Sequence, residues 1–126
     1  MVQNPGYSTM FNECVGLKTI TSITATNLSE SCYANMFEGC TSLETVGSIE
    51  VETLAPSCYA YMFSGCKSLR KAPELPATLL ADSCYKGMFE GCILLKEVPV
   101  LLATNLAPSC YTYMFAGCVG LISNYE

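Results

Sequence analysis

The chain has 126 residues, of which 51% are hydrophobic and only 13% charged, so it has ample material for a packed core and lacks the composition of a disordered segment. Six Lys and Arg against eleven Asp and Glu leave a net charge of −5, which argues against a nucleic-acid partner, because such a partner requires a basic face. Histidine is absent, so the commonest general base and zinc ligand is missing. No apolar run approaches the length of a membrane span, and the start lacks the basic and apolar regions of a signal peptide, so we expect neither in this chain.

A ten-residue block recurs along the chain with a period of 26 residues and no insertions. It reads SCYANMFEGC at 31–40, SCYAYMFSGC at 57–66, SCYKGMFEGC at 83–92 and SCYTYMFAGC at 109–118, with a divergent copy, PGYSTMFNEC, at 5–14. All nine cysteines fall in two columns of this repeat. A repeat this strict predicts a solenoid, in which each unit packs only on its neighbours. We therefore predict one domain over 1–126, with units at 1–26 (divergent), 27–52, 53–78, 79–104 and 105–126 (truncated).

Each block is predicted to form a short helix. Ser31 and its equivalents supply an N-cap oxygen, and Gly39 and its equivalents suit the left-handed conformation that ends a helix. Cys32, Met36 and Cys40 are spaced i, i+4 and i+8, which places them on one helical face.

The segment after each block is predicted to form a short strand, at 17–23, 43–49, 69–75 and 95–101. Pro73 and Pro99 cannot donate to a strand ladder, so these strands are expected to enter or leave a tight bend. A polar connection follows, with a further apolar point at Leu28, Leu54, Leu80 and Leu106.

One strand and one short helix in 26 residues is typical of the leucine-rich-repeat class, whose period is roughly 20–29 residues. The fold class predicted is therefore an α/β repeat solenoid, a leucine-rich-repeat-like right-handed superhelix of about five units. An all-β solenoid is the alternative, and the helical spacing of the block makes it the less favoured of the two.

Three segments resemble a known family. MFEGCTSL at 36–43, MFSGCKSL at 62–69 and MFEGCILL at 88–95 are similar to the Phe-x-x-Cys-x-x-Leu core of BspA-like leucine-rich repeats, found in bacterial surface proteins. The resemblance extends over nearly the whole chain, although Met stands before Phe where Ala is usual and the unit is a few residues longer. It implies a non-catalytic binding module on the cell surface or secreted, used in adhesion to host proteins or to other cells.

The sulfur atoms are predicted to be packing. In a helix, Cys32 and Cys40 would lie about 12 Å apart, beyond the roughly 7 Å between Cα atoms that a disulfide allows. Zinc sites need closely spaced cysteine pairs, which the sequence lacks, and a Cu(I) site or a disulfide stays a minor alternative. The predicted core ladder comprises Cys14, Cys32, Met36, Phe37, Cys40, Cys58, Met62, Phe63, Cys66, Cys84, Met88, Phe89, Cys92, Cys110, Met114, Phe115 and Cys118. The tyrosine column is predicted to form an aromatic ladder with its hydroxyls near the surface.

The candidate binding face lies on the strand side, at positions that the repeat leaves variable. Two rows should line up across neighbouring strands, and Lys18, Glu44 and Arg70 should alternate in sign along one of them. The same pattern also describes an ordinary solvated surface. The face comprises Lys18, Thr19, Glu44, Thr45, Arg70, Lys71, Lys96 and Glu97.

Three functions are compatible with these features. The first is a surface adhesion or interaction module that binds a protein or glycan on the strand face. The second is an assembly module that self-associates through the ends of the solenoid, because no capping sequence is visible. The third is a soft-metal or redox protein that uses the cysteines. The sequence indicates no enzyme, no catalytic residues, no metal site and no cofactor.

Overall fold

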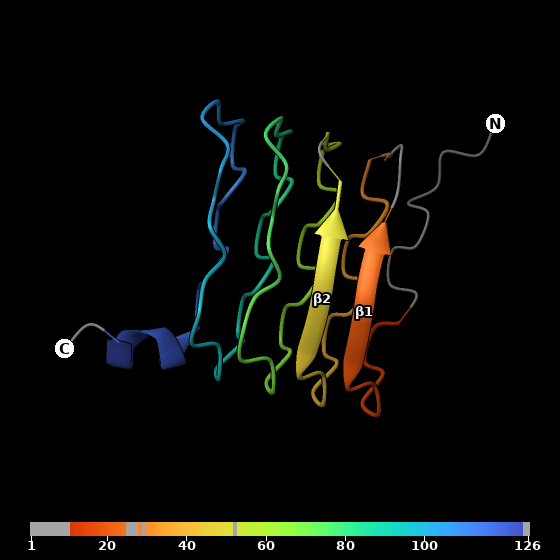
Figure 1. Ribbon diagram of the computed structural model, residues 1–126, viewed down its shortest axis with the longest axis vertical. Helices are drawn as coiled ribbons and strands as arrows, with labels where there is room; N and C mark the ends of the chain where they lie inside the picture. The colour runs from red at the N-terminus through yellow and green to blue at the C-terminus, as the bar shows by residue number, and fades with distance from the viewer. Residues whose placement is uncertain (1–10, 25–27, 29, 52, 125–126) are drawn as a thin grey trace.

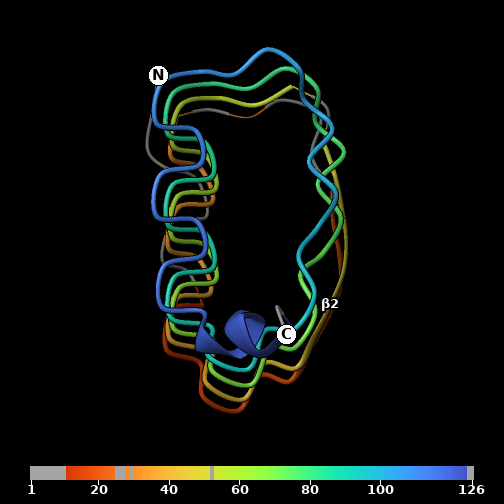
Figure 2. The same cartoon turned by 90° about the vertical axis from the view of Figure 1, so that its left-hand side faces the viewer.

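The structure is a computed structural model, and it describes residues 11–24, 28, 30–51 and 53–124. Its regular elements are strand β1 (Thr19–Thr24), strand β2 (Thr45–Glu50) and a 3-10 helix, η1 (Val119–Asn124). Successive 26-residue units lie side by side (Figure 1). Each unit has two walls, one extended and one made of turns (Figure 2). Among the described residues, no helix combines the length and the apolar character needed to cross a membrane.

The extended side, here called the strand wall, consists of β1, β2 and the segments 71–79 and 97–105. β1 and β2 are parallel, with Thr19 opposite Thr45 and Ile23 opposite Ile49. Beyond β2 the wall continues through isolated parallel bridges: Thr53 to Leu79, Lys71 to Glu97, Leu75 to Leu101 and Leu79 to Asn105. The offset between partners is 26 residues throughout, so the period of the sequence is also the register of the wall.

The strands predicted at 69–75 and 95–101 are replaced by these single bridges. Proline explains the difference, because Pro73, Pro76 and Pro99 have no N–H to donate to a neighbouring segment. The first two units have no proline at these positions, and there β1 and β2 form regular strands.

The opposite side, here called the turn wall, consists of residues 11–14 and the blocks 31–40, 57–66, 83–92 and 109–118. The short helices predicted for these blocks are not found. In 31–40 the N–H groups of Ala34, Met36 and Glu38 donate to carbonyls three residues back, at 3.1–3.2 Å, which defines overlapping β-turns instead of an α-helix. The intervening N–H groups donate across to the next unit, as Tyr33 does to the Cys58 carbonyl at 2.9 Å.

Backbone conformation explains why turns replace the helix. Every fourth residue of a block is left-handed, with φ of 59° at Ser31, 59° at Asn35 and 76° at Gly39. A left-handed residue at the third position of a turn is typical of type II turns. The serine predicted as an N-cap and the glycine predicted as a helix end therefore both lie at left-handed turn positions. Because the left-handed residues recur every four positions, this backbone also fits the i, i+4, i+8 spacing that suggested a helix.

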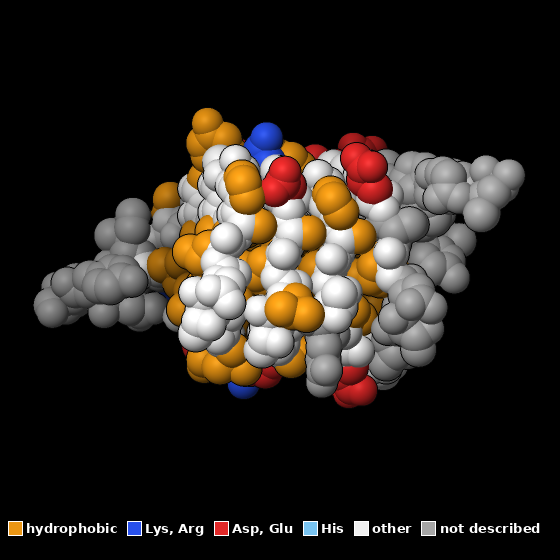
Figure 3. Space-filling model, turned by 90° about the horizontal axis from the view of Figure 1, so that it is seen from above, with side chains coloured by type: hydrophobic (Ala, Val, Ile, Leu, Met, Phe, Trp, Pro, Cys, Tyr) orange, Lys and Arg blue, Asp and Glu red, His pale blue; other side chains and the backbone are white. Residues whose placement is uncertain are grey.

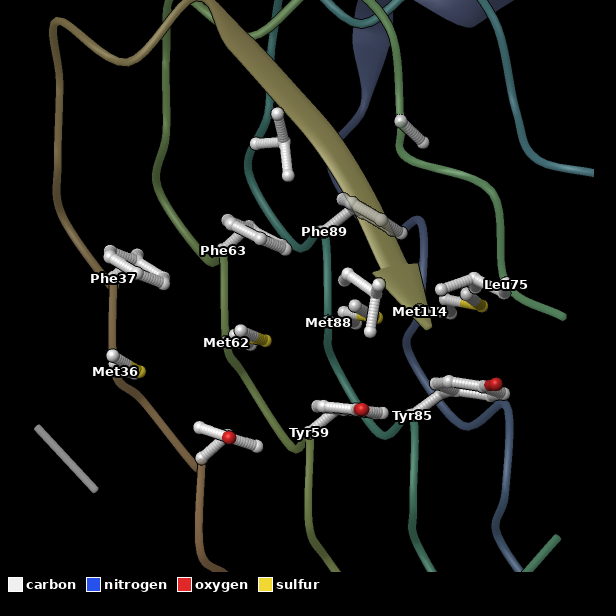
Figure 4. Close-up of a cluster of buried hydrophobic side chains, with 14 of the residues drawn as sticks. Met36, Phe37, Tyr59, Met62, Phe63, Leu75, Tyr85, Met88, Phe89 and Met114 are labelled. Atoms are coloured by element: carbon white, nitrogen blue, oxygen red, sulfur yellow. The ribbon is translucent and has the colours of Figure 1, made fainter. Parts of the chain in front are cut away.

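The core between the walls is built from columns of like residues. Phe11, Phe37, Phe63, Phe89 and Phe115 stack with ring centroids 5.6–5.8 Å apart and nearly parallel planes. Tyr33, Tyr59, Tyr85 and Tyr111 stack in the same way at 5.8–6.0 Å. The methionine column lies between the two aromatic columns (Figure 4). Of the predicted core ladder, Cys14 and Phe115 are partly buried and the other members are buried.

Candidate functional site on the strand wall

The eight residues of the predicted binding face all lie exposed at the start of the strand wall. One row runs through Lys18, Glu44, Arg70 and Lys96, and the next through Thr19, Thr45, Lys71 and Glu97. The register places Thr19 beside Thr45, and Lys71 beside Glu97. The predicted alignment across neighbouring units is therefore present.

A hollow of about 410 Å³ lies where β2 meets the following unit, and we call it the strand-wall hollow. It is lined by Glu44, Thr45, Val46, Gly47, Arg70, Lys71, Ala72, Pro73 and Glu74. The structure thus gathers Glu44, Thr45, Arg70 and Lys71 from the predicted face. The other four predicted residues belong to the neighbouring units and do not line the hollow.

Two small residues, Gly47 and Ala72, are among those that line the hollow. Gly47 has no side chain, and Ala72 on the adjacent segment is short and buried. Glycine is also required at position 47 because of the preceding strand, since a Cβ at this position would overlap the carbonyl oxygen of Thr21 in β1. The sequence reasoning missed Gly47, Ala72, Pro73 and Glu74. The signal that could have found them is the replacement of the larger Val46 by Ala72 one repeat later.

The charges around the hollow are mixed. Lys71 Nζ lies 4.0 Å from Glu97 Oε1, and both side chains are about two-thirds exposed, so this pair contributes little to stability. Lys18, Glu44 and Arg70 form no ion pair among the described residues. Their charges alternate in sign along the row as predicted, but the side chains do not form salt bridges. Arg70 therefore lines the hollow with its planar set of N–H donors in no ion pair with a described residue, and Glu44 and Glu74 line the same hollow.

The hollow carries groups suited to recognition. Its side chains include no Cys or Ser nucleophile and no histidine that would act as a general base. Arg70 and Lys71 offer donors, and Glu44 and Glu74 offer acceptors. This arrangement fits a polar surface with both donors and acceptors.

The cysteines lie away from the hollow, in the core. All nine are free, and within the described residues no cluster of three or more His, Cys, Asp or Glu side chains is arranged to hold a metal ion. Burial raises the pKa of the Cys58 and Cys92 thiols to about 12. These thiols therefore stay protonated at neutral pH, whereas nucleophilic attack and metal binding both require the thiolate.

Compared with known proteins, the chain matches no family model, no curated protein and no solved structure.

Proposed function

We propose that this chain is a non-enzymatic protein-interaction module that binds its partner on the strand wall, centred on the strand-wall hollow. The observation that carries the proposal is that Arg70, which forms no ion pair with any described residue, lines that hollow together with Glu44 and Glu74. Arginine is enriched at the energetically important centres of protein interfaces, because its rigid donor fork binds carboxylates and carbonyls.

The chemistry of the hollow favours a protein partner over a glycan. The hollow is lined mainly by charged and small residues, and none of its lining residues has an aromatic ring that would stack on a sugar face. Direct hydrogen bonds and opposed charges are the usual contacts between polar protein surfaces. The partner expected from this lining presents a carboxylate to Arg70 and a basic or N–H group to Glu44 or Glu74.

The proposed setting is a bacterial cell surface, where the module would serve adhesion. The similarity of MFEGCTSL, MFSGCKSL and MFEGCILL to the core of BspA-like leucine-rich repeats supports this setting. We infer that the stacked units form a solenoid of that general kind, with turns in the position where leucine-rich repeats of this period carry helices. A soft-metal or redox role has less support, because the thiols are buried and protonated.

The proposal is tested by a matched pair of charge reversals. Arg70→Glu changes the hollow, whereas Lys67→Glu makes the same change at another exposed cation, outside the hollow. The wild-type chain and both variants would be immobilised and exposed to extracellular-matrix proteins and to a glycan array. We expect a protein that is retained by the wild type and by Lys67→Glu but lost by Arg70→Glu. Equal retention by all three chains would place the binding surface elsewhere, and retention of glycans alone would contradict the proposed class of partner.

A further inference from the structure

The last segment of the strand wall, 97–106, exposes side chains at positions that are core in the units before it. Val98 is 52% exposed, whereas its equivalents Val46 and Ala72 are 8% and 3% exposed. Leu101 is 40% exposed, whereas its equivalents Ile49 and Leu75 are 1% and 2% exposed. In the earlier units these side chains are covered by the unit that follows. In 97–106 the same side chains are exposed to solvent. Hydrophobic side chains are correspondingly frequent at this end of the stack (Figure 3).

The backbone of this segment is paired on one side only. Lys71, Leu75 and Leu79 form its bridges to the preceding unit, and no described residue forms a bridge on its other side. The segment therefore has a free edge, at which a further strand pairs only through residues other than Pro99, because Pro99 has no N–H to donate.

Helix η1 directs the chain away from this edge. Leu121 still follows the repeat, because its N–H donates to the Cys118 carbonyl at 3.1 Å, as that of Leu95 does to Cys92 at 3.2 Å. Where the earlier units then enter the strand wall, residues 119–124 form η1 instead. The helix lies near one end of the stack (Figure 1) and leaves Val98, Leu101 and Leu106 exposed.

We propose that this edge binds an extended segment of a partner protein, added in parallel to residues 97–106. The bound segment would pair with residues 97–106 in the same parallel way that each unit of the strand wall pairs with the unit before it. The preceding units define what the guest must carry, because their buried residues follow the spacing i, i+3 and i+5, as in Val46, Ile49 and Val51. The guest is therefore an extended peptide with apolar side chains at that spacing, selected by those side chains and held by main-chain hydrogen bonds to residues other than Pro99.

The peptide LKTITSITATNL, which is residues 17–28 of this chain, is a suitable probe because it carries this spacing at Ile20, Ile23 and Ala25. We expect the fluorescently labelled peptide to bind the full chain and to slow amide hydrogen exchange within 97–106. A peptide with Ile20→Ser and Ile23→Ser should bind at least about tenfold more weakly, because it loses the buried apolar contacts.

Two neighbouring residues of the chain provide the matched variants. Leu101→Ser removes an apolar contact from the edge, whereas Val100→Ser alters an outward position that is already Ser48 and Glu74 in the preceding units. We expect Leu101→Ser to weaken binding at least about tenfold and Val100→Ser to change it less than about twofold. If thermal melting shows that Leu101→Ser does not fold, Val98→Thr takes its place.

Equal binding by the Leu101→Ser and Val100→Ser chains, or exchange protection outside 97–106, would overturn the proposal. Failure of the peptide to bind would also overturn it. A molecular mass that rises with protein concentration, with exchange protection of 97–106 in the absence of peptide, would instead assign the edge to a second copy of the chain. These outcomes do not depend on Arg70, so they are distinct from the test of the strand-wall hollow.

Discussion

At the scale of single residues, one cysteine column has a role beyond filling space. The thiols of Cys40, Cys66, Cys92 and Cys118 each donate to the carbonyl of the phenylalanine 29 residues earlier, at 3.0–3.2 Å. The Phe11 carbonyl, for example, accepts from both the Cys14 N–H and the Cys40 thiol. Cysteine suits this position because it packs as a small apolar residue and still supplies a weak donor.

Tyr59 differs from the prediction that the tyrosine hydroxyls lie near the surface. Its ring is buried in the tyrosine column, and its hydroxyl is buried with no hydrogen-bond partner among the described residues. A buried hydroxyl without a partner is destabilising by about 1–3 kcal/mol.

We therefore expect Tyr59→Phe to raise the free energy of unfolding, by about 1 kcal/mol in a urea titration. Tyr111→Phe is the matched control, because Tyr111 lies in the same column but is only partly buried, and it should change the free energy little. A loss of stability in Tyr59→Phe would mean that the hydroxyl has a partner in solution.

At the scale of the element, sequence reasoning identified the buried side of each block but misassigned its backbone. The burial of Cys32, Met36 and Cys40 follows from their spacing of four, which helices and four-residue turns share. What separates the two is left-handed φ at Ser31 and Asn35, residue types that serve equally as helix caps. The strand-wall hollow was missed by sequence reasoning, because its lining comes from two different units, residues 44–47 and 70–74.

The turn wall predicts an unusual order of stability at Tyr113, which is exposed and has φ of 59°. Tyr113→Gly should be more stable than Tyr113→Ala by about 1 kcal/mol, because only glycine adopts this conformation without steric cost. In an α-helix the order is reversed, since alanine is favoured over glycine by about 1 kcal/mol. Urea titration of the two variants therefore distinguishes a turn wall from a helix, and greater stability of the alanine variant would contradict the turns.

At the scale of the whole molecule, stability comes from contacts between neighbouring units. Ring stacking, thiol hydrogen bonds and about every second backbone N–H of a block connect one unit to the next, as in the stacked rings of Phe37 and Phe63 and the N–H of Phe37 donating to the Met62 carbonyl at 3.0 Å. The 26-residue period predicted these columns because every unit carries the same residues at the same places.

Burial of the thiols predicts unfolding at alkaline pH. Burial raises the pKa of Cys58 and Cys92 to about 12 and of Cys84 to about 11, against about 8.5 for an unfolded thiol. Between these values the unfolded chain releases protons that the folded chain keeps. Stability is therefore fully present below about pH 8 and falls as the pH rises, by about 1.4 kcal/mol per pH unit for each such thiol.

Urea titrations between pH 7 and pH 11 would measure this slope. Cys92→Ala should make it shallower, because one group with a raised pKa is removed. A free energy of unfolding that does not change up to pH 11 would mean that the thiols are not buried.

The most direct test of the stacked core is a count of reactive thiols without reductant, first in the native protein and then after denaturation. Eight cysteines are buried and Cys14 is partly buried, so we expect at most one thiol to react quickly in the native state and nine to react in the unfolded state. Rapid reaction of several thiols in the native protein would contradict the packed sulfur columns. A total below nine after denaturation would contradict the assignment of all the cysteines as free.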